Sequence, residues 1–335
     1  MGLFRIFMNA QSASKAPFPG ISVVLCTYNG GRYLAEQLES IANQTRLPVE
    51  LIACDDHSTD NTLSILEDFS QRAPFCVRIF LNPKRLGSTC NFDQGIRLAR
   101  EGFIALCDQD DRWAPTKLER LSDILIRDPL LGGVFSDAVL IDGDSNPIGI
   151  SLFAKHRFSA AKQRAFVTNP ATILLKHDVV TGSTLMFRAA MRRHFSAIPP
   201  SWVHDGWLTW IIALHSHLSL TSEPLTAYRI HAGQQIGVGP SHAARRTLLQ
   251  AETRRQHYGR VAHQFHDLLL HLTSANKKEY GLLADEIRQK ICFLQKQSML
   301  SHRRTIRFLQ MFLMLPQYLR YTRGLGSLRN DLLLD

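Results

Sequence analysis

Residues 107–113 read C-D-Q-D-D-R-W and directly follow a short apolar run at residues 103–106. Such a run, followed at once by acidic residues, is typical of a buried strand whose carboxyl end opens into a site. The three carboxylates of Asp108, Asp110 and Asp111 repel one another, and each raises the cost of ionising its neighbours. A hard divalent cation that also holds a phosphate would offset this charge. A solvated acidic turn at the start of the next helix is the alternative, and the stretch alone is compatible with both.

A regular alternation of apolar runs and helical patterns leads up to this stretch. Strands are predicted at residues 21–25, 49–53, 77–81 and 103–106, and helices at residues 33–44, 62–69 and 91–100. Strands that alternate with helices of about ten residues indicate βαβ units and a parallel sheet. No G-x-G-x-x-G motif follows the first strand, which argues against a dinucleotide-binding fold.

Polar residues follow two other predicted strands. Thr27, Tyr28 and Asn29 end the first strand, and Asp55 and Asp56 end the second. Ligands of parallel sheets bind at the carboxyl ends of the strands. We therefore expect these residues and the acidic stretch to lie along one edge of the sheet, which favours the binding-site interpretation of that stretch.

The second half of the chain has a mixed pattern. Strands are predicted at residues 133–141, 180–187, 218–221 and 225–228, and helices at residues 189–195 and 207–214. Between them, residues 145–170 are predicted to form a long polar connection, the kind of loop that often acts as a lid or an acceptor wall. Beyond residue 240, basic amphipathic helices are predicted at residues 243–272, 277–294 and 303–321.

The formal charge of +10 is concentrated in the last third of the chain. From residue 241 onward there are 16 Lys and Arg against 7 Asp and Glu, whereas the first 240 residues are almost neutral. This asymmetry suggests that an anionic surface docks on the tail. Basic and apolar side chains are interleaved between positions 303 and 323, which suits an interfacial helix on an anionic membrane leaflet. The basic ones are Arg303, Arg304, Arg307, Arg320 and Arg323. The alternative is a helical bundle that packs on the catalytic domain with its basic face in water.

Six cysteines occur without a C-x-x-C pair, and several lie in strand-like runs. This pattern indicates buried free thiols in a reducing compartment, and neither a disulfide framework nor a zinc site. No secretory signal precedes residue 20, and no run of about 18 apolar residues predicts a membrane-spanning helix. We expect a cytoplasmic protein, peripheral on the inner face of a bacterial inner membrane.

Five motifs together resemble those of family 2 glycosyltransferases, which have the GT-A fold. They are V-V-L-C-T-Y-N-G-G-R-Y-L at residues 23–34, D-D-H-S-T-D-N-T at 55–62, C-D-Q-D-D-R-W-A-P-T-K-L at 107–118, H-D-G-W-L-T-W-I at 204–211 and Y-R-I-H-A-G-Q-Q-I-G at 228–237. The last two resemble the rhamnosyltransferases that build O-antigen and other bacterial surface polysaccharides. The Q-x-x-R-W element of processive synthases is absent, which favours transfer of one or a few sugars.

The resemblance implies an α/β fold with a mixed, mainly parallel sheet and helices on both faces, followed by a helical extension. It covers roughly residues 20–240 and implies a GT-A catalytic domain at residues 21–240. Residues 1–20, which close with Pro17, Pro19 and Gly20, are expected to be a flexible leader, and residues 241–335 form the basic helical tail predicted above. Within the catalytic domain, residues 21–112 would form the nucleotide-binding half and residues 113–240 the acceptor half.

A nucleotide-diphospho-sugar donor and a divalent cofactor, Mg²⁺ or Mn²⁺, are also implied by the resemblance. It assigns the metal chiefly to Asp110, with Asp108 binding the ribose or a metal-bound water and Asp111 in support. His231 would reach the metal or the diphosphate, although a lone loop histidine is more often a hydrogen-bonding partner. We expect the acceptor to be a glycan or a lipid-linked glycan.

Several residues match positions where the family binds the nucleotide, namely Thr27, Tyr28, Asn29, Asp55 and Asp56. Of these, Asp56 matches the carboxylate that accepts an N–H of the base. Arg85 would contact the nucleotide or a phosphate, and the alternative is a solvated basic residue on a loop.

Asp205 matches the family's general base, which takes the proton of the acceptor hydroxyl in an inverting transfer. The alternative is that Asp205 only caps the helix that begins there. His204 would tune Asp205 or meet the acceptor. Trp113 and Trp207 would offer aromatic faces to the acceptor sugar, and the alternative for both is core packing.

The expected reaction is inverting, metal-dependent transfer of a sugar, with L-rhamnose from dTDP-rhamnose favoured by the resemblance. A UDP- or GDP-sugar donor on the same fold is one alternative, and a non-catalytic nucleotide-sugar-binding subunit is another. Nucleic-acid binding is disfavoured by the apolar content of the tail and by the acidic edge of the sheet.

Overall fold

The computed structural model describes residues 7–8, 18–195, 197–231, 234, 253–274 and 280–333. The chain divides into two compact units, which we describe separately. The sheet unit comprises Met1–Pro170 and Val179–Gln234, and the helical unit comprises Ala171–Asp178 and Gln235–Asp335. The short segment at residues 171–178 thus belongs to the helical unit, although it lies inside the expected catalytic domain.

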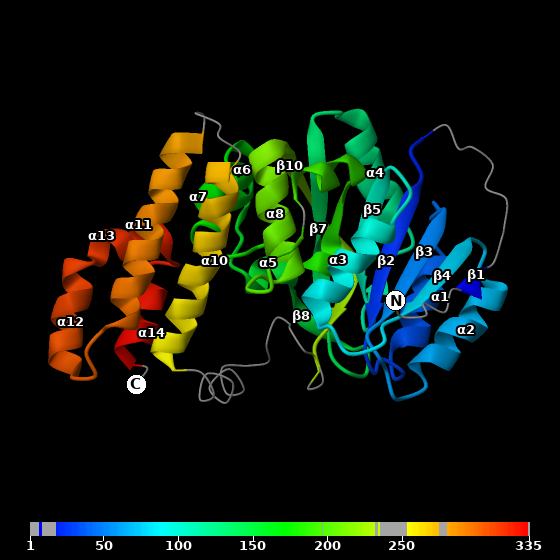
Figure 1. The fold of residues 1–335 in the computed structure, drawn as a ribbon, viewed down its shortest axis with the longest axis horizontal. Helices are drawn as coiled ribbons and strands as arrows, with labels where there is room; N and C mark the ends of the chain where they lie inside the picture. Colours follow the sequence, from blue (N-terminus) through cyan, green and yellow to red (C-terminus); the bar gives the residue numbers. More distant parts are fainter. Residues whose placement is uncertain are drawn as a thin grey trace. The chain divides into compact units, whose positions relative to one another are not determined.

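The sheet unit is built on one mixed sheet (Figure 1). Its described strands are β1 (Phe7–Met8), β2 (Ile21–Thr27), β3 (Glu50–Asp55), β4 (Cys76–Leu81), β5 (Phe103–Asp108), β6 (Arg112–Trp113), β7 (Leu131–Ile141), β8 (Pro147–Ser151), β9 (Leu185–Arg188) and β10 (His217–Arg229). Their order is β1-β4-β3-β2-β5-β9-β7-β10-β6, with β8 paired to β7. Strands β4, β3, β2 and β5 are parallel, whereas β9 runs antiparallel to both of its neighbours. The prediction of a mixed, mainly parallel sheet is confirmed.

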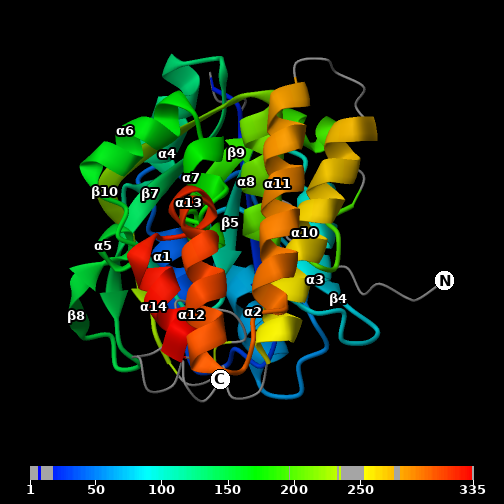
Figure 2. The same ribbon diagram turned by 90° about the vertical axis from the view of Figure 1, so that its left-hand side faces the viewer.

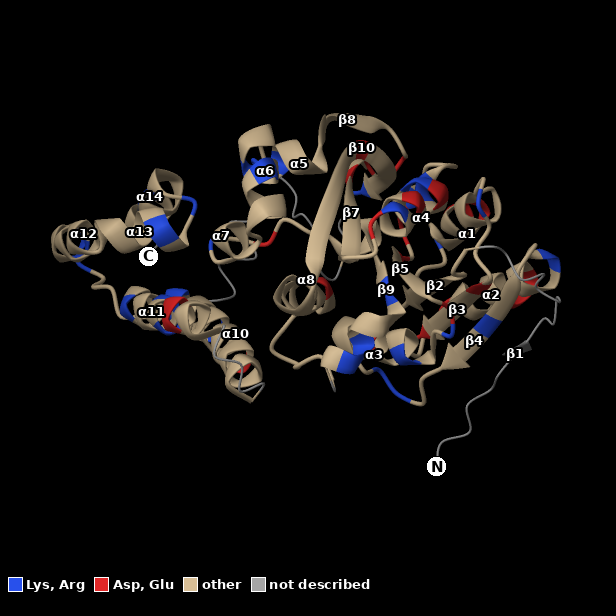
Figure 3. Ribbon diagram, turned by 90° about the horizontal axis from the view of Figure 1, so that it is seen from above, with Lys and Arg blue, Asp and Glu red and all other residues tan. Residues whose placement is uncertain are grey.

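Helices cover both faces of this sheet. The helices of the sheet unit are α1 (Leu34–Ala42), α2 (Thr62–Arg72), α3 (Ser88–Leu98), α4 (Lys117–Arg127), α5 (Leu152–Lys155), α6 (Ala160–Thr168) and α8 (His204–His215), with short 3-10 turns at Gly182–Thr184 and Ala189–His194. Figure 3 shows α1 and α4 on one side of the sheet and α3 and α8 on the other. Alternate residues of each strand point to opposite faces, so β2 supplies Val23 and Leu25 to the core under α1, α2 and α4. On the other face, Gly95 lets α3 approach, because a Cβ there would lie 2.5 Å from Val24.

Three predictions about the second half are corrected by the structure. Residues 145–170 are not a loop: they form β8, α5 and α6, because Phe153, Phe158 and Phe166 are buried together against Phe135. The two short strands expected at residues 218–221 and 225–228 are one strand, β10, with register shifts around Pro224. The strand expected from residue 180 begins only at Leu185, after a 3-10 turn.

The leader and the cysteines also differ in part from expectation. Two leader residues, β1, pair antiparallel with β4, so the edge of the sheet extends into residues 1–20. The other leader residues up to residue 17 lie outside the described part of the chain. All six cysteines are free thiols, as expected, but Cys90 and Cys292 are exposed.

The helical unit consists of α7 (Ala171–Leu174), α10 (Arg254–Ser274), α11 (Gly281–Ser298), α12 (Arg304–Leu313), α13 (Leu315–Tyr321) and α14 (Leu325–Leu333). Figure 2 shows α10 and α11 side by side, with α12, α13 and α14 grouped next to α11. The helix expected at residues 303–321 is broken into α12 and α13, because Pro316 begins a new helical turn. The starts expected at residues 243 and 277 lie outside the described residues.

Buried polar groups hold this bundle together. The carboxylate of Asp331 on α14 accepts hydrogen bonds from Gln297 on α11 at 2.9 Å, from Tyr318 on α13 at 2.6 Å and from Tyr258 on α10. Lys290 is buried between the Phe265 ring, 4.0 Å away, and the Leu175 carbonyl. Burial lowers the pKa of Lys290 to about 7. Among the residues that are described, no helix has the length and hydropathy needed to cross a membrane.

Candidate functional site

The expected polar edge of the sheet is present. In the strand register, Thr27 lies beside Asp55, and Cys26 lies beside Asp108. Because β2, β3 and β5 are parallel neighbours, the loops that follow them emerge at the same edge. The prediction that the three polar clusters share one edge is therefore confirmed.

The loops after β2 and β3 are bound tightly to each other. The carboxylate of Asp55 accepts hydrogen bonds from the Thr27 hydroxyl at 2.8 Å and from the Ser58 amide and hydroxyl at 2.8 and 2.6 Å. Asn29 adopts a left-handed backbone, with φ of 49°, and its side chain accepts the amide of Thr59 at 2.8 Å. Asp55, Thr27 and Asn29 thus shape this edge through contacts with protein groups.

Asp56 is equally well bonded. One of its oxygens accepts the Asn82 side-chain amide at 3.0 Å and the Leu86 backbone amide at 2.7 Å, and the other accepts the Gly87 amide at 2.8 Å. The side chain is buried. Asp56 therefore fixes the loop between β4 and α3 and retains only part of its accepting capacity for a nucleobase.

Tyr28 connects that loop with the acidic stretch. The Arg85 guanidinium lies over the Tyr28 ring, 4.0 Å from its centre. The side-chain amide of Gln109 pairs with the Tyr28 backbone, accepting its N–H at 2.8 Å and donating to its carbonyl at 3.1 Å. The ring and the guanidinium together form a flat cationic surface of the kind that suits a base or a phosphate.

The acidic stretch itself carries unbalanced negative charge. Asp108 is half-buried, and its carboxylate makes no hydrogen bond within the described parts of the chain. Burial raises the pKa of Asp108 well above its usual value, and the carboxylates of Asp111, Asp110 and Asp205 raise it further. Burial and the charge of Asp110 also raise the pKa of Asp111, to about 7. A cluster of hard oxygen donors whose charges repel one another fits a divalent cation.

Lys117, at the first turn of α4, is a buried cation that interacts electrostatically with Asp111 and Asp108 of this cluster. Its ammonium group contacts the Ser183 carbonyl, the Thr226 hydroxyl at 3.0 Å and the face of Trp113 at 3.7 Å. Burial lowers the pKa of Lys117 to about 7, against the opposing effect of nearby acidic groups that include Asp111. Sequence reasoning did not single out Lys117, although the T-K-L that follows D-D-R-W-A-P marks it.

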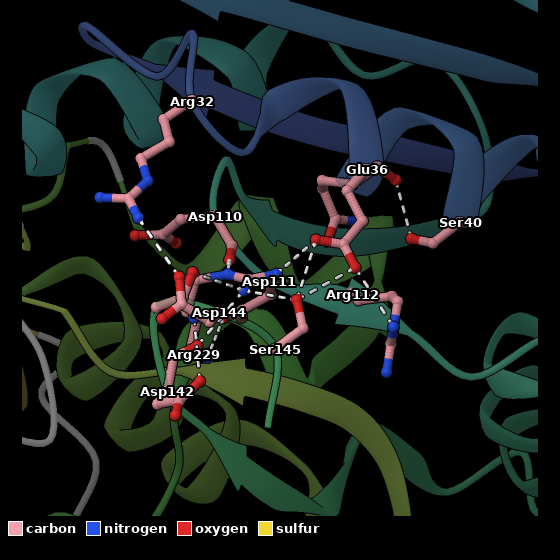
Figure 4. A network of polar contacts seen from close by, with 12 residues as sticks. Arg32, Glu36, Ser40, Asp110, Asp111, Arg112, Asp142, Asp144, Ser145 and Arg229 are labelled. Carbon is pink, nitrogen blue, oxygen red and sulfur yellow. Dashed lines mark hydrogen bonds and ion pairs between the residues drawn. The ribbon is translucent and has the colours of Figure 1, made fainter. Parts of the chain in front are cut away.

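Arg229, at the end of β10, holds the acidic stretch in place. Its side chain is fully buried, and its Nε donates to the backbone carbonyl of Asp110 at 2.7 Å. Its backbone amide donates to the carboxylate of Asp111 at 3.0 Å. The guanidinium also reaches Glu36 on α1 at 2.5 Å and the Ser145 hydroxyl at 2.8 Å (Figure 4). One arginine thus ties together the acidic stretch, α1 and the turn between β7 and β8, and the sequence analysis did not identify it.

His231 lies two residues beyond Arg229 and contacts Asp110. Its Nε2 is 2.8 Å from a carboxylate oxygen of Asp110, and its ring lies 4.8 Å from that of Tyr33. Within the residues that the structure describes, no three His, Cys, Asp or Glu side chains converge closely enough to bind a metal ion by themselves. A metal here would therefore take Asp110, with Asp108 or His231 nearby, and complete its shell with oxygens of a diphosphate.

Asp205 occupies the second position of α8, whose N-cap residue is Val203. Its carboxylate accepts the backbone amide of Gly182 at 3.0 Å and that of Gly206 at 2.7 Å. Burial raises the pKa of Asp205 against the opposing effect of these hydrogen bonds. Asp205 thus lies inside the first turn of α8 and is not its N-cap residue, and its charge is among the causes that raise the pKa of Asp108.

The three residues expected on the acceptor side are buried in this conformation. His204 stacks on Phe92 with 3.8 Å between ring centres, and burial lowers its pKa to about 3, so its ring is neutral. Trp207 packs near Trp202, and Trp113 belongs to the core cluster under α4. None of the three presents a face to solvent, since each side chain is buried.

Comparison with known proteins identifies the family. Residues 22–195, just over half of the chain, match the family model for glycosyl transferase family 2. The chain belongs to that family. Its GT-A fold is shared by solved structures of S. aureus TarS residues 1–349 with UDP-GlcNAc (TM-score 0.60, 16% identity, 87% of this chain and 79% of that chain) and of the mannosyltransferase PcManGT from Pyrobaculum calidifontis with GDP-Man and Mn²⁺ (TM-score 0.54, 15% identity, 89% and 75%).

Similar curated sequences extend this result. The chain is 26% identical over 222 residues to an uncharacterized glycosyltransferase of Nostoc sp. (63% of this chain, 65% of that protein) and 38% identical over 216 residues to an uncharacterized Mycobacterium bovis protein (63% and 59%). It is 27% identical over 235 residues to the dTDP-rhamnosyl transferase RfbG of Shigella flexneri (66% and 76%). The chain thus spans less than two thirds of the length of the first two relatives.

Proposed function

We propose that this protein is an inverting, metal-dependent glycosyltransferase that transfers a sugar to a lipid-linked or growing cell-surface polysaccharide. Membership of glycosyl transferase family 2 supports the reaction class. The similarity to RfbG supports L-rhamnose from dTDP-rhamnose as the donated sugar. The observation that carries the proposal is the 3-10 turn at Gly182–Thr184, where the Gly182 amide donates to the Asp205 carboxylate and the next carbonyl, of Ser183, accepts from the buried Lys117 ammonium that follows the acidic stretch.

On the donor side, the acidic stretch faces the diphosphate of the nucleotide sugar. A divalent cation bound there would stabilise the negative charge that gathers on the leaving diphosphate. Asp110 and Asp108 would supply oxygens for it, and His231, 2.8 Å from Asp110, would orient that carboxylate. The cationic surface of Tyr28 and Arg85 binds the base or a phosphate of the same nucleotide.

On the acceptor side, Asp205 acts as the base. Its carboxylate takes the proton of an acceptor hydroxyl while that oxygen attacks the anomeric carbon of the donor sugar. The bond between the anomeric carbon and the diphosphate oxygen breaks on the opposite face, and its electron pair leaves with the nucleotide diphosphate. One attack from the opposite face inverts the anomeric configuration. Burial raises the pKa of Asp205 and so makes its ionised form a stronger base than a solvated carboxylate.

Thermal unfolding with a panel of dTDP-, UDP- and GDP-sugars, each with and without Mn²⁺, tests the donor assignment. We expect dTDP-rhamnose with Mn²⁺ to raise Tm the most, because a ligand that binds only the folded state stabilises it. A larger shift with a UDP- or GDP-sugar would keep the fold and the reaction class but replace the donor. No shift with any nucleotide sugar would contradict the proposal as a whole.

The variant Asp205→Asn separates catalysis from binding. We expect transfer to fall by about 10²- to 10⁴-fold, the usual contribution of a general base, with an unchanged Tm shift on donor binding. Transfer at the wild-type rate would remove the base assignment. The wild-type rate of transfer is the reference. If the wild type binds the donor but transfers no sugar, the protein is a non-catalytic nucleotide-sugar-binding subunit.

We also propose that the protein works as a peripheral protein on the cytoplasmic face of the bacterial inner membrane. The basic charge of residues 241–335 supports this location, since anionic lipids attract clustered Lys and Arg. A lipid-linked acceptor would be presented at that surface.

A further inference from the structure

Helix α12 has an unusual outward face. Beyond Arg304 and Thr305 in its first turn, its exposed side chains are all large and apolar, with exposed fractions from 44% for Ile306 to 72% for Leu313, and they are Ile306, Phe308, Leu309, Phe312 and Leu313. In a helix of 3.6 residues per turn these positions share one broad side. A surface helix of a soluble domain normally directs its polar side to water. We call these five residues the α12 apolar face.

One charged side chain of α12, that of Arg307, points into the helical unit. Arg307 is fully buried, where its guanidinium donates to the backbone carbonyls of Ser301 at 2.9 Å and His302 at 2.8 Å. Met311, one turn later, joins the core of the helical unit. The sequence pattern placed Arg307 among the interfacial basic residues, and the structure corrects this. Because Arg307 points inward, no charged side chain interrupts the α12 apolar face.

The exposed charge at the start of α12 is positive. No Asp or Glu occurs between Glu286 and Asp331, and this stretch contains nine Lys and Arg residues, of which Lys290 and Arg307 are buried and Arg288 and Arg320 pair with Asp285 and Glu286. Arg303 and Arg304 are exposed at the start of α12, and Figure 3 shows no acidic residue on α12 or α13. Long basic side chains beside an apolar strip can keep their charged ends among lipid headgroups while the strip enters the acyl boundary.

We infer that the α12 apolar face inserts into the surface of an anionic lipid bilayer and is the element that anchors the protein there. This inference rests on the membrane location proposed above and assigns it to one helix. Exposed apolar patches of this kind mark interaction sites. The surrounding positive charge selects an anionic partner surface. In a symmetric contact, a second copy would bring the same basic residues against themselves.

Co-sedimentation of the full chain with phosphatidylcholine vesicles, with and without phosphatidylglycerol, tests the inference. We expect the wild type to bind the anionic vesicles. The double change of Phe312→Ser and Leu313→Ser should lower its partition coefficient at least about tenfold, because two large apolar groups no longer leave water. Arg303→Gln should lower it about fivefold for anionic vesicles only, since each basic residue near the surface contributes on the order of 1 kcal/mol.

Leu282→Ser provides the matched control. Leu282 is 85% exposed on α11 of the same unit but lies outside the α12 apolar face, so we expect wild-type partitioning. The Tm shift with nucleotide sugars, measured without vesicles, should be unchanged in every variant. If the protein binds no nucleotide sugar but its vesicle binding depends on the α12 apolar face, the proposed reaction is contradicted and the membrane inference is supported.

Two results would overturn the inference. The first is a failure of the vesicle assay, either because the wild type does not bind anionic vesicles or because the Phe312→Ser, Leu313→Ser variant partitions as the wild type does. The second is a concentration-dependent dimer that this variant abolishes, because a second copy would then occupy the face.

Discussion

Two groups of carboxylates lie at the same edge of the sheet but differ in how many hydrogen bonds they accept from protein groups. Asp55 and Asp56 at the end of β3 each accept three hydrogen bonds from nearby loops. The carboxylate of Asp108 at the end of β5 accepts none from the described residues, and burial together with three other carboxylates raises its pKa. A carboxylate that accepts several hydrogen bonds from protein groups holds those groups in place. A carboxylate left with repulsive neighbours is available to a ligand that brings positive charge.

The largest effect should follow from removing the principal metal ligand. We expect Asp110→Ala to lower transfer by more than about 100-fold, since changes one shell further out already cost about 10- to 100-fold. The Mn²⁺-dependent part of the Tm shift with the nucleotide sugar should vanish as well. Wild-type dependence on Mn²⁺ in this variant would contradict the assignment.

A second prediction concerns the residue that positions the acidic stretch. Lysine at position 229 keeps the positive charge but cannot span the Asp110 carbonyl, Glu36 and Ser145 at once, so Arg229→Lys should reduce transfer about 10- to 100-fold. The reduction should be accompanied by a higher Mn²⁺ concentration for half-maximal rate, which a purely structural defect would not change. Arg120→Lys, at an exposed ion pair with Glu223, is the control and should leave both quantities unchanged.

The contrast between the two groups can be tested directly by stability. Asp56→Asn replaces an acceptor oxygen by a donor that faces backbone N–H groups, and should lower the free energy of unfolding by about 1–3 kcal/mol. Asp108→Asn removes a charge that its neighbours oppose, so the free energy of unfolding should stay equal or rise at neutral pH while transfer falls. Urea unfolding of the two variants measures this difference. Equal destabilisation would show that both groups are structural.

The smallest effect is a displaced pH profile. Asp205 must be ionised to accept a proton, and burial raises its pKa above the usual value of about 3.9. Transfer should therefore be retained above the raised pKa and lost as the pH falls through it. The acid limb of kcat/KM should therefore lie above the ordinary pKa of an Asp carboxyl. An acid limb at or below the ordinary Asp pKa would argue that Asp205 is not the base.

Local pattern was sufficient for the first half of the fold. The strands and helices up to β5 lie within a few residues of their predicted positions because each is a short apolar or amphipathic segment with its own turn signals. The polar residues that follow β2, β3 and β5 could be placed at one edge for the same reason, since parallel strands carry their ends together. The family motifs then singled out Asp110, Asp205 and His231.

The features that sequence reasoning missed depend on distant partners. The segment at residues 145–170 reads as polar, but three of its phenylalanines meet Phe135 from another strand. Lys117 and Arg229 look like ordinary basic residues until Ser183, Thr226 and the acidic stretch are brought around them. Burial of a charged side chain is a property of the packed molecule, and nothing in the local pattern reports it.

By itself, the sequence determined the alternating architecture, the acidic ends of the strands and the basic character of the tail, because these depend on residue type and short-range spacing. Only the tertiary structure decided which carboxylates at the sheet edge are satisfied and which remain under repulsion. It also decided that Arg307 faces inward and leaves α12 with an uninterrupted apolar face. Both outcomes depend on which groups the fold brings within hydrogen-bonding distance, and that is set by long-range packing.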